Sequence, residues 1–412
     1  ETMMGHLPAS YKIVPTLQAA DVMVVNSCSF IKAAEDETIE TLNELAQWRN
    51  NSRRIILTGC FVEQEKADLL DRFPFIDGIL GTGGLTQLDE IVQASFRNER
   101  LYIHPNRANN LLGQGQRTLA TPRHYAYLKI AEGCDHACSF CKIPYLRGPS
   151  VFKTPETILA EATGLVDQGV KEIILVAQDT TAYEGRPGYK LADLLLDLDT
   201  ISGLLWIRVM YAYPTKVDNK LIVAFNKSKK IVAYLDMPIQ HCNDTILLAM
   251  KRYGSKAKII DTIQRLRKGV IGIKLRTTVL VGFPGETQVH VDELAHFMKN
   301  NQFDHVGIFT YSAEANTPAA TLEGQVKEAD KQARFDQLMT LQQSISRSLN
   351  QSYAGQTLPV IIDSLPKGRR SFDAPEIDGH VRILNATKAD IGQIRQVYIT
   401  DTLDYDVIGH IT

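Results

Sequence analysis

The sequence lacks any long apolar segment. Its longest apolar runs, such as residues 173–177 and 279–281, have the length of a strand, whereas a helix that crosses a bilayer needs about 20 apolar residues. No charged stretch followed by an apolar one opens the printed sequence, as a signal peptide would. We therefore expect a cytoplasmic protein with no membrane partner.

Cysteine is scarce, and neither sign of charge prevails. Six cysteines in 412 residues are too few for a disulfide scaffold, so they are expected to be thiols with a chemical role. Lysine and arginine number 45 against 47 acidic residues, which gives a net charge of -2. No global positive field would gather nucleic acid, so direct nucleic-acid binding is not expected, although a local basic patch is compatible with this charge.

The first part of the chain alternates between strand-like and helical patterns. Apolar runs at residues 22–25 and 54–57 flank a helical pattern at 35–48, which predicts a parallel sheet with crossover helices. Cys28 and Cys60 each follow one of these runs by three residues. They are expected at the carboxyl ends of parallel strands, where such sheets bind ligands. The alternative is two buried, weakly polar side chains.

A polar stretch at residues 106–121 has no strand or helix period and is typical of a linker. Strand candidates then alternate with helical patterns, which predicts a partial (β/α)6 barrel with its chemistry at the carboxyl ends of the strands. The six candidates are residues 126–130, 172–177, 205–210, 232–236, 275–281 and 305–310.

After a long polar helix expected at residues 327–352, short β runs and turns predict a small antiparallel barrel. The sequence thus predicts an α/β protein of three domains. A parallel-sheet domain covers 1–117, the partial barrel covers 118–349 and the small β-barrel covers 350–412.

Three cysteines with the spacing Cys134-x-x-x-Cys138-x-x-Cys141 follow the first barrel strand. Three thiolates on one loop can hold three irons of a 4Fe-4S cube and leave the fourth iron open, where S-adenosylmethionine can bind and be cleaved to a radical. A zinc site is the alternative, but it would require a fourth protein ligand. Phe140 lies between the last two cysteines, where it either shields the cluster or packs against the barrel.

The stretch from Ala131 to Gly148 closely resembles the radical S-adenosylmethionine methylthiotransferases. The resemblance runs nearly end to end and includes residues 26–31, 58–60 and 282–287. It implies an amino-terminal cluster-binding domain, a radical core and a carboxyl-terminal TRAM domain. It also implies two 4Fe-4S clusters, with Cys28 and Cys60 as two of three ligands of the auxiliary one. The third ligand would precede Glu1, so we expect a truncated chain with an incomplete auxiliary site.

Within this family the sequence is most similar to the branch that methylthiolates the β-carbon of an aspartate in ribosomal protein S-twelve. The similarity rests on residues 178–181, 237–241 and 373–379. It implies that ribosomal protein as substrate and a reducing electron donor of the flavodoxin or ferredoxin type. The alternatives are the sibling branch, which modifies tRNA adenosine, and a non-catalytic iron-sulfur redox sensor. Phe152-Lys153-Thr154 departs from the Ser-Arg-Pro usual in the family.

Four further residues are candidates for binding S-adenosylmethionine. Gln178 and Asp179 follow the second barrel strand, and Gly282 follows the fifth, where a glycine lets the backbone approach a ligand. Arg208 lies within an apolar strand, so we expect it to point to the barrel mouth and pair with a carboxylate, either of the protein or of the cofactor. The alternative for Gln178 and Asp179 is that they only begin a polar loop, and the alternative for Gly282 is that it only permits a turn.

The last segment is net negative, with six basic and eight acidic residues from Asn350 onward. Asp373, Glu376 and Asp378 gather at one proline-containing turn. This pattern predicts an acidic loop that receives the lysines and arginines of a basic ribosomal protein, whereas an RNA-binding barrel would show a basic face with stacking aromatics. The alternative is a solvated acidic loop.

Overall fold

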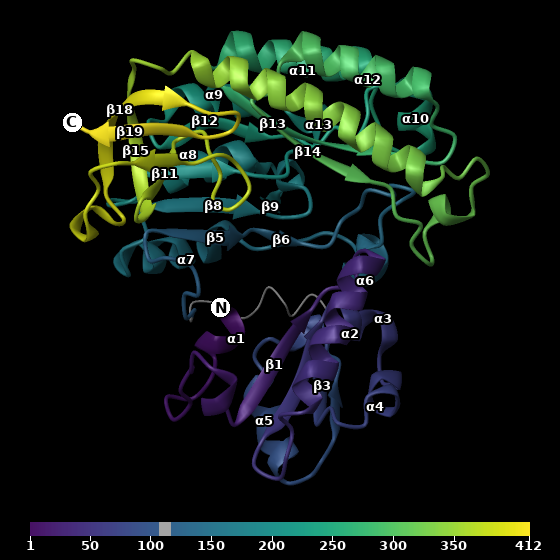
Figure 1. Ribbon diagram of the computed structural model, residues 1–412. Coiled ribbons are helices and arrows are strands. Elements are labelled where there is room, and N and C mark those ends of the chain that lie inside the picture. The colour runs from purple at the N-terminus through teal and green to yellow at the C-terminus, as the bar shows by residue number, and fades with distance from the viewer. Residues whose placement is uncertain (107–116) are drawn as a thin grey trace. The chain divides into compact units, whose positions relative to one another are not determined.

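The computed structural model describes residues 1–106 and 117–412, and most of the stretch expected as a linker lies outside them. The chain forms two compact units (Figure 1). The first contains Glu1–Ala120, Glu132–Phe152 and Ser312–Ala320, and the second contains Thr121–Ala131, Lys153–Tyr311 and Thr321–Thr412. The cysteine triplet therefore belongs to the first unit, although it follows a barrel strand in sequence. No helix among the described residues has the length and apolar character needed to cross a membrane.

The first unit is built on a parallel sheet with the strand order β1-β2-β3-β4, as the alternating pattern predicts. Every residue of β2 is buried, which is typical of a central strand covered on both faces. The strands are β1 (Val22–Ser27), β2 (Arg54–Gly59), β3 (Gly78–Leu80) and β4 (Leu101–Ile103), and the helices are α1 (Thr2–Gly5), α2 (Lys32–Ala46), α3 (Cys60–Glu65), α4 (Asp68–Arg72), α5 (Leu88–Phe96) and α6 (Ile143–Arg147).

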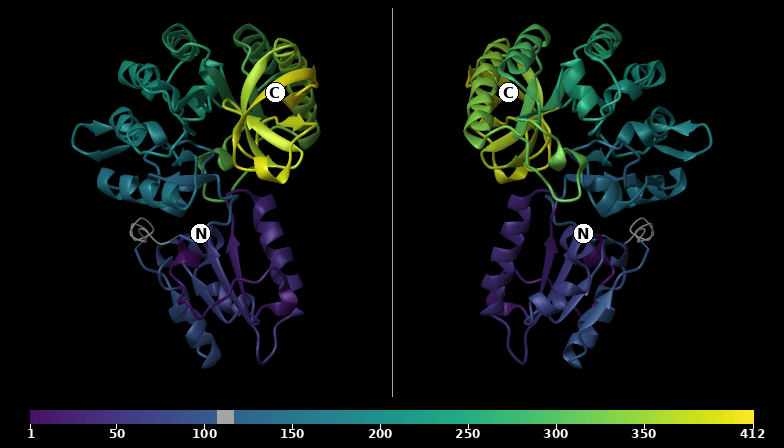
Figure 2. Two further views of the ribbon diagram at one scale, coloured as in Figure 1. Left: turned by 90° about the vertical axis from the view of Figure 1, so that its left-hand side faces the viewer. Right: turned by 90° about the vertical axis from the view of Figure 1, so that its right-hand side faces the viewer.

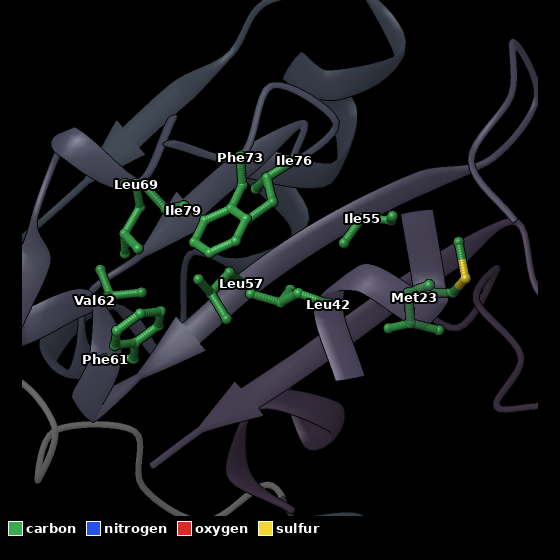
Figure 3. Packing of buried hydrophobic residues seen from close by; sticks show 11 residues of the cluster. Met23, Leu42, Ile55, Leu57, Phe61, Val62, Leu69, Phe73, Ile76 and Ile79 are labelled. Carbon is green, nitrogen blue, oxygen red and sulfur yellow. The ribbon is translucent and has the colours of Figure 1, made fainter. Parts of the chain in front are cut away.

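One apolar cluster fixes the register of this sheet. Side chains from β1, β2 and β3 meet side chains of α2, α3 and α4, and most of them are fully buried (Figure 3). A one-residue slip would turn the apolar face of a strand away from this cluster, so the register is strongly specified. The buried members are Met23, Leu42, Leu45, Ile55, Leu57, Phe61, Val62, Leu69, Phe73, Ile76 and Ile79.

The second unit contains a six-stranded parallel sheet with the order β14-β13-β12-β11-β8-β5, which confirms the partial barrel. Figure 2 shows the helices of this unit on the outer side of the curved sheet. All six predicted strands exist within a residue or two of their expected bounds. They are β5 (Tyr125–Lys129), β8 (Glu172–Val176), β11 (Trp206–Val209), β12 (Ile231–Asp236), β13 (Lys274–Val281) and β14 (His305–Thr310).

Several helices of the second unit begin at residues that cap them. Thr154, Asp218 and Ser255 each accept a backbone N–H of the first turn, which replaces a hydrogen bond that a helix end otherwise lacks. The helices are α7 (Pro155–Asp167), α8 (Leu191–Asp199), α9 (Asn219–Lys227), α10 (Asp244–Ala249), α11 (Lys256–Gly269), α12 (Gln288–Asn301) and α13 (Glu328–Gln351), and the short strands are β9 (Glu184–Arg186) and β10 (Tyr189–Lys190). Two further short strands, β6 (Ala131–Glu132) and β7 (Val151–Phe152), pair with each other, and β7 belongs to the first unit.

The chain ends in a closed barrel with the order β15-β16-β17-β19-β18, as the short β runs predict. Its pairs are antiparallel as expected, except that β17 and β19 run parallel. Closure pairs both edges of this small sheet, so neither edge is open to another chain. Its apolar interior includes Val360, Val381 and Val397, all fully buried. The strands are β15 (Thr357–Ser364), β16 (Lys367–Arg370), β17 (Val381–Ile383), β18 (Ile394–Thr402) and β19 (Val407–Ile411).

Candidate functional site

The loop that carries the three cysteines is closed by its own backbone. The Cys134 N–H donates to the Gly148 carbonyl at 3.0 Å, and the Ser150 N–H donates to a carboxylate oxygen of Asp135 at 3.0 Å. Gly133 has a φ of +80°, and a Cβ there would lie 2.1 Å from the Pro149 carbonyl oxygen. Only glycine permits this approach, so the loop is held as a short, defined segment.

The three thiols differ in exposure. Cys138 is buried, whereas Cys134 and Cys141 are half-buried. The Ile143 N–H donates to the Cys141 sulfur at 3.4 Å, and Phe140 is half-buried beside it. In the described part of the chain, no three cysteine, histidine or acidic side chains are placed to hold one metal ion. A cubane requires no such convergence, because each thiolate binds a different iron, so this loop fits a cluster by donor type and spacing.

Cys28 and Cys60 lie where the sequence predicts them, directly after two neighbouring parallel strands. Ser27 of β1 pairs with Gly59 of β2, so the next residue of each strand is a cysteine. Gly59 has a φ of +103°, and a Cβ there would lie 2.3 Å from the Ser27 carbonyl oxygen. The glycine lets the two strand ends approach closely, which brings an exposed and a buried thiol to one sheet edge.

Arg147, at the end of α6, contacts one of these thiols. Its guanidinium donates to the Cys60 sulfur at 3.0 Å and lies 3.4 Å from a carboxylate oxygen of Glu132. Burial raises the pKa of the Cys60 thiol, and the Arg147 charge opposes this rise. Burial alone would lower the pKa of Arg147, but Glu132 and Cys60 outweigh it and raise that pKa. The sequence gives Arg147 no role, because nothing in the spacing of a single arginine reveals its partner.

Lys142 joins three segments of the first unit. Its buried ammonium donates to the Ser29 carbonyl at 3.0 Å and to the Gln64 side chain at 2.8 Å, and it lies 3.4 Å from Glu314. Since these partners come from the sheet domain and from the 312–320 segment, the lysine fastens the cysteine loop to both. This role could not be predicted, because the partners are far apart in sequence.

In the second unit, the loop after β13 is locked in place. Gly282 has a φ of +76°, and a Cβ there would lie 2.3 Å from the Lys331 side chain of α13. The Gly282 N–H donates to Glu286 at 2.8 Å, and Arg334 donates to the same carboxylate oxygen at 2.8 Å. Phe283 is fully buried. A rigid backbone segment therefore stands at the carboxyl edge of the partial barrel, where the sequence places a binding loop.

Gln178 and Asp179 follow β8 at the same edge. Asp179 is buried and caps a short 3-10 helix (Thr180–Ala182) by accepting the Ala182 N–H at 3.1 Å. Its carboxylate also lies 3.5 Å from the Lys216 ammonium. Asp179 thus stabilises the start of this short helix, and the half-buried Gln178 precedes it at the strand end.

Arg208 has the carboxylate partner that its position in an apolar strand predicts, and that partner belongs to the protein. Its guanidinium is fully buried and donates to Glu172 at 2.8 Å, while Arg369 of β16 donates to the other oxygen of Glu172 at 2.7 Å. Arg208 also lies over the ring of Tyr234, 4.7 Å from its centre. Glu172 therefore joins the two barrels through Arg369, and the buried Arg208 side chain contacts Glu172 and Tyr234 within the partial barrel.

The acidic turn is not a free docking loop, which corrects the prediction from charge. Asp373 is fully buried in an ion pair with Arg370 at 2.6 Å, and the Arg370 charge and His305 hold its pKa below the usual range despite burial. Asp378 accepts the Tyr234 hydroxyl at 2.8 Å and lies 3.3 Å from Arg276. The other turn residue named above, Glu376, accepts the Tyr125 hydroxyl at 3.0 Å. These carboxylates face cations and hydroxyls of the partial barrel, so they fasten the C-terminal barrel to it.

His241 and Cys242 follow β12 and are both fully buried. The His241 Nδ1 accepts the Asn243 N–H at 2.9 Å, and burial lowers the pKa of this histidine to about 3. Burial likewise raises the pKa of Cys242 to about 12. Both side chains are therefore neutral, which suits their packing in the interior.

Three family models match the chain. The Radical SAM superfamily matches residues 128–298, the Uncharacterized protein family UPF0004 matches 1–81, and the TRAM domain matches 354–412. Among solved structures, the radical S-adenosylmethionine methyltransferase TsrM from Kitasatospora setae has a TM-score of 0.54 at 14% identity, over 72% of this chain and 63% of its own. That likeness concerns the fold. Together with the thiol triplet after the first barrel strand, the matches define a radical S-adenosylmethionine enzyme.

Curated relatives specify the branch. The ribosomal protein uS12 methylthiotransferase RimO of Desulfitobacterium hafniense is 38% identical over 100% of this chain and 95% of its own length. The RimO proteins of Desulforamulus reducens and a Thermoanaerobacter species are 40% and 41% identical, over 100% and 97% of this chain and 96% and 93% of their own. The chain belongs to the RimO family of methylthiotransferases.

Proposed function

We propose that this protein adds a methylthio group to the β-carbon of an aspartate in ribosomal protein uS12, the S-twelve protein expected from the sequence. The observation that carries the proposal is the match to RimO relatives along the whole chain, with the cysteine triplet on a closed loop. A non-catalytic redox sensor would not need the partial barrel. The tRNA alternative is not favoured, because these relatives are uS12 methylthiotransferases.

The chain's own residues bind and position the reactants. A 4Fe-4S cluster held by Cys134, Cys138 and Cys141 would supply the electron that cleaves S-adenosylmethionine to a carbon radical. The rigid loop at Gly282 and the strand end at Gln178 offer backbone and amide groups for that cofactor at the barrel edge. Phe140, half-buried in the cysteine loop, would exclude water from the cluster.

We further infer that Cys28 and Cys60 are two ligands of an auxiliary cluster that delivers the methylthio sulfur. Two reduced thiols at the ends of paired strands, one of them next to a guanidinium, support this assignment. The radical cluster also needs a low-potential one-electron donor of the flavodoxin or ferredoxin type. A ribosomal substrate would place the reaction in the cytoplasm.

The test is a reaction of the reconstituted, reduced protein with uS12 and, separately, with tRNA. Intact-mass analysis of uS12 and nucleoside analysis of tRNA report the product, and 5′-deoxyadenosine reports cofactor cleavage. We expect the methylthio gain on uS12 alone. A gain on tRNA alone would overturn the substrate, and an absence of 5′-deoxyadenosine would overturn the radical chemistry.

A further inference from the structure

Tyr211 has an unfavourable backbone conformation at the carboxyl edge of the partial barrel. It follows β11 by two residues and has a φ of +57°, a region that residues other than glycine rarely adopt. Lys251 and Gln302 also have positive φ, but each lies at the end of a helix, where this conformation is common. A strand precedes Tyr211, so helix termination does not explain its conformation.

Hydrogen bonds on both sides hold this conformation. The Tyr211 N–H donates to Asp236 at 3.0 Å, and the Tyr211 carbonyl accepts the Thr180 N–H at 3.1 Å. Asp236 ends β12 and is fully buried, and its other carboxylate oxygen accepts the Arg276 guanidinium at 2.9 Å. Residues from neighbouring strand ends therefore fix the tyrosine, and strain that is held in this way is typical of binding and catalytic sites.

The Tyr211 side chain is available to a ligand, since 45% of the residue is exposed. Its hydroxyl is close enough to Asp236 and Arg276 to sense both charges. Partial burial and the Asp236 charge raise the pKa of Tyr211, and the Arg276 charge opposes this rise. The phenol therefore keeps its proton and can donate a hydrogen bond to an acceptor on a ligand.

Arg276 offers a second donor on the same side of the sheet. A Cβ at Gly307 would lie 3.3 Å from the Arg276 Nη2 and 3.4 Å from the Phe309 ring, so the glycine leaves space beside both groups. Phe309 is 56% exposed, as expected of a side chain that faces an open space. A phenol, a guanidinium and an aromatic ring thus line one face of the partial barrel.

We propose that Tyr211 binds the target aspartate of uS12, with its hydroxyl donating to the aspartate carboxylate beside the Arg276 Nη2. This inference rests on the proposed function, which makes that aspartate the reacting residue. Two donors fix a carboxylate and discriminate against asparagine, because the amide NH2 would face one of them. Asp236 already uses both of its oxygens within the protein. The competing explanation is that Tyr211 only shapes the turn after β11.

The experiment measures how the full chain binds its substrate. Isothermal titration calorimetry gives the dissociation constants for uS12 and for a uS12 in which asparagine replaces the target aspartate. Tyr211→Phe removes only the hydroxyl, and Tyr211→Gly also relieves the backbone strain. Tyr398→Phe is the matched control, because Tyr398 lies on β18 and is 38% exposed. Denaturant midpoints report the stability of each variant.

We expect the parent to bind uS12 about tenfold more tightly than the asparagine form, because a hydrogen bond to a charged group has this effect. Tyr211→Phe should reduce the preference to about threefold, and Tyr398→Phe should retain it. Tyr211→Gly should lose the preference without a lower denaturant midpoint, since relief of strain offsets the lost contacts.

A tenfold preference that survives in Tyr211→Phe, or no preference in the parent, would overturn the role of Tyr211. A much lower denaturant midpoint in Tyr211→Gly would do the same, because it would show that the tyrosine serves packing. Failure of the parent to bind uS12 at all would instead overturn the proposed function, and the inference with it.

Discussion

At the scale of single residues, the site depends on a few thiols and on glycines that allow close backbone approach. Cys138 and Cys242 show the contrast. Both are buried, but Cys138 lies on a loop with two other cysteines, whereas Cys242 follows β12 and is fully buried. We therefore propose that the same residue type binds a cluster at Cys138, as its spacing predicts, and serves packing at Cys242.

Replacing Cys138 should remove the radical cluster. Two thiolates cannot hold the cube, so Cys138→Ala should lose the cluster and with it nearly all cleavage of S-adenosylmethionine. Cys242→Ala is the control, expected to keep both at a cost of about 1 kcal/mol in stability. Iron content and 5′-deoxyadenosine yield after anaerobic reconstitution measure the outcome, and full cleavage by Cys138→Ala would refute the assignment.

Two glycine substitutions can separate the cost of backbone strain at positive φ from the cost of a steric clash of the added Cβ. Gly282 and Gly272 have φ values of +76° and +69°, but only at Gly282 would a Cβ meet Lys331, whereas Gly272 has nothing within 4 Å. Gly272→Ala should cost about 1 kcal/mol from strain alone, and Gly282→Ala should cost roughly 2–3 kcal/mol because contact adds to strain. Denaturant midpoints measure the stability lost in each variant. Equal losses in the two variants would show that the Lys331 side chain of α13 moves aside at no cost.

At the scale of elements, charge joins the two barrels of the second unit. Glu172 of β8 receives one arginine from β11 and one from β16, and the acidic turn of the C-terminal barrel meets Arg276 and His305. Removing one member of such a buried set leaves an uncompensated charge, which costs about 3–5 kcal/mol. Charge counting along the sequence suggested an outward acidic face, because it cannot show which cations a folded strand presents.

Unfolding of the second unit should depend on pH through His305. Burial disfavours its charge, but Asp378 and Asp373 outweigh burial and raise its pKa, although Arg370 opposes them. Tyr234 also lies near the ring, and the His305 Nε2 is 3.2 Å from the Phe372 carbonyl oxygen. A raised folded pKa gives stability that is complete below the unfolded value of about 6.5 and is lost as pH rises through the folded value.

The comparison variant is His305→Asn, which cannot titrate. The denaturant midpoint of the parent should exceed that of the variant most at pH 6 and approach it as the pH rises toward 9. Below about pH 4, protonation of Asp373, whose pKa is lowered, should weaken both proteins. A constant difference between parent and variant from pH 6 to 9 would contradict the charged state of His305.

At the scale of the whole molecule, periodicity was enough to predict most of the fold. The six barrel strands, the parallel sheet before them and the closing small barrel follow from alternating apolar runs, because burial on both faces of a parallel strand leaves a clear signature. The grouping into units was not predictable. The cysteine loop follows β5 in sequence but packs with the first unit through Lys142 and Arg147, and such long-range contacts leave no local pattern.

Methylthiolation of uS12 by this chain can be measured directly in cells. The most direct measurement is the intact mass of uS12, with tRNA nucleosides in parallel, from a strain that lacks the gene and is complemented with the parent or with Cys138→Ala. We predict that the parent restores one methylthio group on the aspartate of uS12, that Cys138→Ala restores none, and that tRNA is unchanged throughout. An unmodified uS12 in the presence of the active parent, or a gain confined to tRNA, would contradict the account.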